Sequence, residues 1–185
     1  WNNGGSMIFR SIALGLLLAV CALAQTRVRE AAEKGDAEAQ FNLGMMYAHG
    51  QGVLWDYTIA RQWFEKAADQ GNVDAQFMLG VSYHVGAHDQ QDYATARQWY
   101  EKAATQGDSD ARSSLGMLYA EGQGVPQDDV PSYMWLDLAV AHSTNDAQKD
   151  SAIENRAKIT RRMTPAQIAE AQRLSQQCEA RQFKG

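Results

Sequence analysis

The strongest constraint on this chain is a stretch of 36 residues that recurs in register. The first copy covers 37–72, the second 73–108 and the third 109–144. Gly35, Gly71 and Gly107 mark the same point of successive copies and fix the period. A fixed period of this length is typical of stacked repeat proteins, in which no single unit can bury its own apolar face.

Each copy predicts a pair of helices. In the first copy, Ala39, Leu43 and Tyr47 fall on one face of a first helix that runs to about Ala48. Gly44 interrupts this helix, and its return at the same place in the next two copies predicts a close approach of the second helix. The second helix shows the same spacing of apolar residues at Ile59, Ala60, Trp63, Phe64 and Ala67.

The ends of the helices carry capping residues. Each glycine of the period is expected in the left-handed conformation that ends a helix, and the next residue caps the following one. These next residues are Asp36, Asn72 and Asp108. Candidate caps of the second helices are Asp56, Asp92 and Asp128.

Composition narrows the class of protein. At 185 residues, with 45% hydrophobic and 21% charged residues, the chain is predicted to be globular. A net charge of −5 argues against a nucleic-acid partner, because phosphate binding needs clustered Lys and Arg. Cys21 and Cys178 are too few for a disulfide scaffold, so packing must hold the fold.

The N-terminal part is interpreted as a targeting segment. Residues 1–6 precede the first methionine and are set aside from the fold. Residues 7–24 show a positive start ending at Arg10, an apolar run and small residues at its end, which predicts a signal peptide cut after Ala24 and an exported, periplasmic or secreted protein. The alternatives are a lipoprotein acylated at Cys21, although Val20 is larger than the residue such sites prefer, and a retained anchor.

The two ends of the array differ from its centre. Residues 25–36 match the end of a repeat and predict an N-terminal half-repeat. Residues 145–185 are predicted to form C-terminal capping helices, because the repeat signature fades and charged residues replace it. Thr164, Pro165 and Gln167 predict the start of the last helix. Its apolar stripe is expected at Ile168, Ala171, Leu174 and Cys178.

The recurring residues resemble a known family. Leu-Gly, then Tyr, then Gly-x-Gly-Val, then Ala-x-x-Trp-Phe/Tyr-x-Lys-Ala-Ala-x-x-Gly, at a period of 36 from Arg29 to about Ala141, are similar to the Sel-one-like repeats, relatives of the tetratricopeptide repeats. The C-terminal part is similar to the ends of many bacterial secreted members. The resemblance implies an all-α solenoid, a right-handed superhelix of antiparallel helix pairs, that serves as a protein-interaction scaffold. It implies no catalytic residue.

By analogy with tetratricopeptide repeats, the first helices line the concave face, so candidate partner-binding residues are those that vary between copies there. An alternative assigns four of these residues, Phe41, Phe77, Met45 and Met117, to the core. The candidates are Phe41, Phe77 and Ser113; Asn42, Met78 and Ser114; Met45, Val81 and Met117; and His49, His84 and Glu121 near the helix ends.

These observations favour a non-catalytic, monomeric adaptor that binds a protein or peptide, with no cofactor and no membrane contact beyond the possible anchor. The alternative is binding or hydrolysis of a small β-lactam-like ligand, as the resemblance suggests for cysteine-rich secreted relatives; this chain lacks their paired cysteines.

Two further residue patterns have simpler explanations than a functional site. A metal site at His84, His88 and Asp89 is weighed against a polar loop, and the polar loop is preferred. Trp63, Trp99 and Trp135 recur at the period and are interpreted as interior residues rather than as an aromatic cage.

Overall fold

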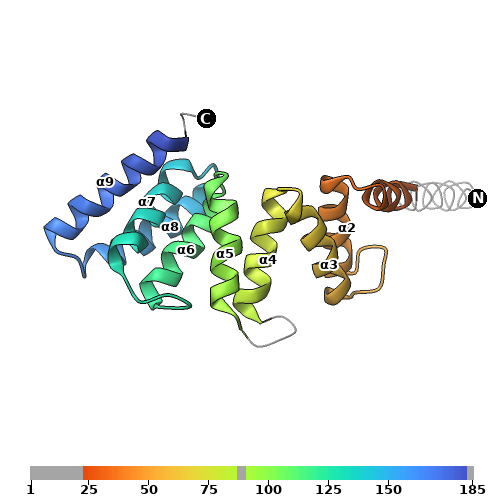
Figure 1. Ribbon diagram of the computed structural model, residues 1–185, viewed down its shortest axis with the longest axis horizontal. Coiled ribbons are helices and arrows are strands. Elements are labelled where there is room, and N and C mark those ends of the chain that lie inside the picture. Colours follow the sequence, from red (N-terminus) through yellow and green to blue (C-terminus); the bar gives the residue numbers. More distant parts are fainter. Residues whose placement is uncertain (1–22, 87–90, 183–185) are drawn as a thin grey trace, which may run out of the picture. The chain divides into compact units, whose positions relative to one another are not determined.

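The computed structural model describes residues 23–86 and 91–182, and within these ranges it contains helices and no strand (Figure 1). A helix over 23–33 comes first. The all-α solenoid class expected from the sequence is confirmed. The helices that follow are α2 (Ala37–His49), α3 (Tyr57–Asp69), α4 (Val73–Val85), α5 (Tyr93–Thr105), α6 (Ser109–Glu121), α7 (Asp129–His142), α8 (Asp146–Thr160) and α9 (Pro165–Gln182).

Contacts within the chain define two compact units. The first ends at Asn72 and contains the helix over 23–33 with α2 and α3. The second begins at Val73 and contains α4 to α9. In the second unit each of α4, α5 and α6 contacts the next helix, and α7 contacts both α8 and α9.

Aspartates begin the helices as expected. Asp36 and Asp108 accept hydrogen bonds from the backbone amides three residues on, at 2.7 and 2.6 Å. Asp56 and Asp92 accept the equivalent bond at 3.0 Å, and Asp128 accepts one from Val130 at 3.0 Å. Such caps satisfy amides that have no partner inside the helix. The prediction for α9 is also confirmed, because Thr164 and Gln167 exchange hydrogen bonds.

The turns between repeats take the expected left-handed backbone. Gly35, Gly71 and Gly107 have φ angles of 98°, 89° and 107°. Side chains with a Cβ rarely adopt this conformation, which explains why glycine returns at each turn.

The helices of each pair approach closely at a second set of glycines. A Cβ added to Gly44 would lie 2.6 Å from the ring of Phe64, and one added to Gly80 would lie 2.4 Å from the ring of Tyr100. At Gly116 the nearest atom, in Leu136, would be 2.6 Å away. The close approach predicted from the sequence is therefore confirmed.

The tryptophans are not the interior residues predicted from the sequence. Phe64, at 0% exposure, and Tyr100, at 2%, fill the interior, whereas the tryptophan before each is only partly buried. Lys66 Nζ lies 4.1 Å from the centre of a Trp63 ring, and Lys102 Nζ lies 3.7 Å from one of Trp99. Each ring therefore meets a cation, and the Trp63 ring also packs against the core cluster of Leu43.

A buried polar position also repeats. Gln40 donates from its side chain to the carbonyl of Ala32 at 3.1 Å, eight residues back. Arg112, two periods later and 1% exposed, donates from Nε to the carbonyl of Ala104 at 3.1 Å. Two different side chains thus satisfy a carbonyl at the end of the preceding helix.

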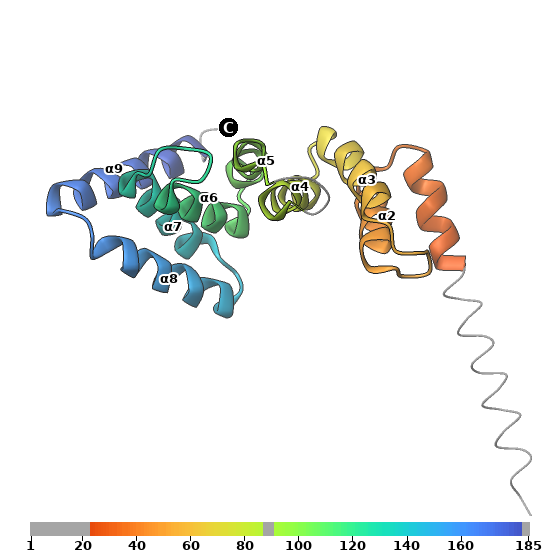
Figure 2. The same ribbon diagram turned by 90° about the horizontal axis from the view of Figure 1, so that it is seen from below.

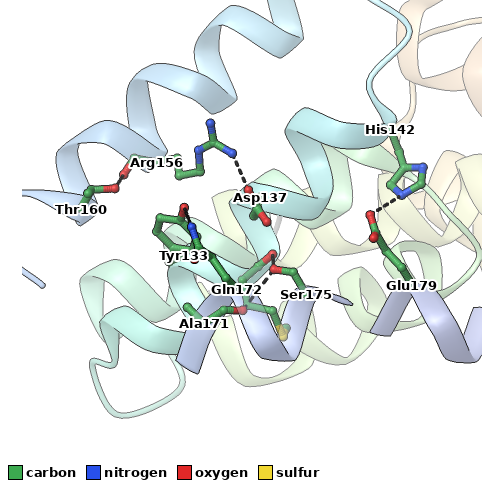
Figure 3. Close-up of polar contacts among 10 residues, drawn as sticks. Tyr133, Asp137, His142, Arg156, Thr160, Ala171, Gln172, Ser175 and Glu179 are labelled. Atoms are coloured by element: carbon green, nitrogen blue, oxygen red, sulfur yellow. Dashed lines mark hydrogen bonds and ion pairs between the residues drawn. The ribbon is translucent and has the colours of Figure 1, made fainter. Parts of the chain in front are cut away.

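The C-terminal helices pack on α7 through apolar and polar contacts (Figure 3). Ile159 of α8 and Ala171 of α9 join the core cluster of Tyr133 and Leu136. Ion pairs at Asp137 with Arg156 and at Asp129 with Arg162 link α7 to α8 and to the turn after it. Arg156 is partly buried and Arg162 is exposed. Ala171 is buried at the centre of the stripe predicted for α9, whereas Ile168, Leu174 and Cys178 are only partly buried.

Within the described ranges, no helix combines the length and apolar character needed to cross a membrane. The signal peptide predicted over 7–24 lies outside the described residues except for its last two positions.

Candidate functional site

The candidate residues lie on the first helix of each pair. Four belong to α2 in the first unit and eight to α4 and α6 in the second. Because α4 and α6 contact each other, the structure brings those eight residues onto neighbouring helices of one unit. Their role in binding stays a prediction.

The candidates Phe41 and Phe77 belong partly to the core. Phe41 and Phe77 are partly buried, and each ring centre lies 5.8 Å from that of an interior aromatic residue, Phe64 or Tyr100. Ser113, their counterpart in the third pair, is also partly buried. The phenylalanines therefore support the core as well as showing part of their surface.

The candidates at the next two positions of the first helices are exposed or partly buried. Asn42 is exposed and donates to Glu38 at 3.5 Å, whereas Met78 and Ser114 are partly buried. Met45, Val81 and Met117 are partly buried. Met78 and Met117 of the second unit are unbranched and offer adaptable contacts to a ligand.

The helix ends hold three different residues. His49 is exposed, and its Nδ1 lies 3.0 Å from the carbonyl oxygen of Met45. Glu121 is exposed at the end of α6. His84 is partly buried, and the next residue, Val85, is 56% exposed.

His84 belongs to a polar cluster in the second unit. Its Nδ1 lies 3.4 Å from the hydroxyl of Tyr100, and its ring meets that of Tyr93 edge to face with centres 5.3 Å apart. Ser114 hydrogen-bonds to Tyr100, and Glu121 interacts electrostatically with His84. We call His84, Tyr100, Ser114 and Glu121 the repeat-2 polar cluster.

Burial sets the protonation states in this cluster. Desolvation raises the pKa of Tyr100 to about 12, and the hydrogen bond from Ser114 opposes this shift in part. Desolvation lowers the pKa of His84, against the opposite pull of the Glu121 carboxylate. At neutral pH the cluster therefore presents a neutral phenol and a neutral imidazole beside one carboxylate.

Three of these four residues are among the candidates predicted from the sequence, and Tyr100 is not. The missed signal is the residue that follows the repeated tryptophan. The two residues read Trp-Phe at 63–64, Trp-Tyr at 99–100 and Trp-Leu at 135–136. Only the second version adds a hydroxyl at an interior position. A buried hydroxyl needs a hydrogen-bond partner, so it predicts a polar neighbour.

The described residues hold no group of three or more His, Cys, Asp or Glu that could bind a metal ion. His88 and Asp89, which entered the metal hypothesis, lie outside the described residues.

Comparison with known proteins places the chain in a family. The Sel1 repeat model matches 37–72, 73–108 and 109–143. A Sel1 repeat protein from Oxalobacter formigenes is similar in structure, with a TM-score of 0.62 and 32% identity over 70% of this chain and 96% of that one. A protective antigen of uropathogenic Escherichia coli with an SLR fold gives a TM-score of 0.63 and 33% identity over 77% of this chain and 34% of that one, so this chain spans about a third of its length. No curated protein matches the chain. With three matched repeats over more than half of its length, the chain belongs to the Sel1 repeat family.

Proposed function

We propose that this chain is a non-catalytic scaffold that binds a protein or peptide partner through the surface of its first helices. The observation that carries the proposal is the contrast between interior and surface along the repeat. Leu43, Leu79 and Leu115 are the same residue at 1%, 0% and 0% exposure. The partly exposed neighbours change from copy to copy, as Asn42, Met78 and Ser114 do. Packing accounts for the repeated residue and leaves the variable ones for recognition.

The second unit gives the proposed surface a definite chemistry. Met78 and Phe77 of α4 offer apolar contact, and polar groups lie near them at His84 on the same helix and at Ser114 and Glu121 on α6. An extended or helical peptide needs both, because its side chains seek apolar contact and its polar groups need partners.

We further propose that the protein acts in the bacterial cell envelope or outside the cell. Two observations support this: the positive start and apolar run of residues 7–24, and the bacterial sources of the structural relatives.

The test uses the complete chain as bait in an envelope extract, with captured proteins identified by mass spectrometry. The test variants are Asn42→Arg and Met78→Glu on the first helices. The matched controls, Gln62→Arg and Gln98→Glu, introduce the same charges at exposed positions of α3 and α5. We expect the chain and both controls to capture a partner that at least one test variant loses.

The captured partner is then purified and titrated against all five proteins. A charge placed in an apolar contact weakens binding at least tenfold, which corresponds to about 1.4 kcal/mol. Melting temperatures should stay within a few degrees of each other. Equal affinity for all five proteins would overturn the assignment of the first-helix surface.

A further inference from the structure

Two of the most exposed large apolar side chains of the first unit are neighbours in one loop. Leu54 is 90% exposed and Trp55 is 64% exposed, both in the loop that joins α2 to α3. We call these two residues the loop-1 patch. Exposed tryptophan and leucine in one place indicate a contact surface.

The repeat fold does not require these residues. At the positions of Leu54 and Trp55 the other copies have Gln90 with Gln91 and Pro126 with Gln127. The second copy thus has a glutamine pair in the sequence where the first has Leu-Trp. The apolar pair in the first copy needs another explanation.

The loop packs against the beginning of the helix over 23–33. Gly52 makes this possible, because a Cβ at that position would lie 1.8 Å from Gln25 Nε2. Both ribbon views show the loop between α2 and α3 beside the start of this helix (Figures 1 and 2). A cavity of about 510 Å³ at this place is lined by Arg29, Tyr47, Gly52, Val53, Leu54, Trp55, Asp56 and Ile59.

This place is also where an apolar stretch of the sequence ends. Residues 12–24 contain no charged side chain, and Arg27 and Arg29 are the first charges after them. Gln25, which contacts the loop, follows that stretch directly. In the retained-anchor alternative, in which this stretch stays in a bilayer, Gln25 and the loop that it contacts lie just beyond the point where the chain leaves the lipid.

We propose that the loop-1 patch contacts the interfacial layer of a lipid bilayer. Tryptophan favours this layer, because its ring is apolar and its N–H can bond to water or headgroups. Apolar area provides the attraction rather than charge, since Glu30 and Glu33 lie close to Arg27 and Arg29 in the same helix. The proposal is independent of the partner surface on the first helices.

The test measures tryptophan quenching by vesicles of phosphatidylcholine whose acyl chains carry bromine. The complete chain is compared with Trp55→Gln, which has the residue of the second copy, and with Trp99→Phe as matched control in α5. We expect the complete chain and the control to share a quenched component that Trp55→Gln lacks. Replacing a tenth of the lipid with the anionic lipid phosphatidylglycerol should change this quenching little, because apolar area rather than charge provides the attraction.

Two results would overturn the proposal: equal quenching in the complete chain and Trp55→Gln, or no association of the complete chain with the vesicles. In the second case a Leu54→Gln/Trp55→Gln double variant that loses protein capture from the envelope extract would assign the patch to a protein partner. Both variants should keep the melting temperature of the parent, because the two side chains are exposed.

Discussion

At the scale of single residues, the second repeat differs from its neighbours by a few atoms that create its polar cluster. Tyr100 adds a hydroxyl where Phe64 and Leu136 have none, and His84 occupies the position of Ala48 and Ala120. The hydroxyl is buried, so its loss of water must be offset by hydrogen bonds, and the residues that provide them are His84 and Ser114.

The lowered pKa of His84 predicts a pH-dependent stability. Unfolding releases the imidazole to its ordinary pKa near 6.5, so the unfolded state binds the proton more readily than the folded state. The contribution of neutral His84 to the free energy of unfolding is therefore complete above about pH 6.5 and is lost as the pH falls below that value. We expect the melting temperature to fall more between pH 7 and pH 5 in the parent than in His84→Ala.

The control for this experiment is His49→Ala, because His49 is exposed. Its melting temperature should follow the parent over the whole pH range. Thermal unfolding followed by circular dichroism gives the three curves, and parallel curves for the parent and His84→Ala would contradict the prediction.

At the scale of helices, the sequence predicted the close approach but not the residue that fills it. Gly44 interrupts a helical pattern, returns at the period, and so indicates a neighbour that a side chain would block. Trp63 and Phe64 recur together, so the period alone does not distinguish the interior residue from its neighbour. The choice depends on the direction of each side chain from its helix, which only the packed structure gives.

The glycine contact in the second pair gives an element-scale prediction. Gly80→Ala should stabilise the helix by about 1 kcal/mol, because alanine has the higher helix propensity. The added methyl group, however, overlaps the ring of Tyr100. Overpacking of this kind costs about 1–3 kcal/mol, so we expect a net loss of stability.

A double-mutant cycle with Tyr100→Ala isolates this contact. Removal of the ring makes room for the methyl group, so the double variant should be more stable than the sum of the single changes predicts, by about 0.5–3 kcal/mol. Urea unfolding measures all four proteins. Additive effects would show that the ring does not limit this position.

At the scale of the whole molecule, the sequence predicted the array of helix pairs and the start of the last helix. It predicted that charged residues replace the repeat signature after the third copy, but not that Arg156 and Arg162 pair with Asp137 and Asp129 of α7. A charge pattern along one helix does not say which acids the next helix presents, so these pairs could not be read from the sequence. The loop-1 patch was missed because a single Leu-Trp pair carries no periodic signal.

The terminal helix is expected to protect the apolar face of α7. Ala171 in α9 is fully buried in the cluster that contains Tyr133 and Leu136, whereas Ala169 in the same helix is exposed. Ala171→Glu would bury a carboxylate with no arranged partner and should displace α9, with a loss of more than about 3 kcal/mol. The unprotected face of α7 should then bind a fluorescent apolar dye.

Ala169→Glu is the matched control, because it adds the same charge to the same helix on its solvated side. It should leave both melting temperature and dye binding unchanged, since exposed substitutions usually change stability by less than about 0.5 kcal/mol. A repeat array depends on its terminal units to cover the last apolar surface. If Ala171→Glu behaved like Ala169→Glu, α9 would be dispensable for that cover, and α8 alone would have to protect α7.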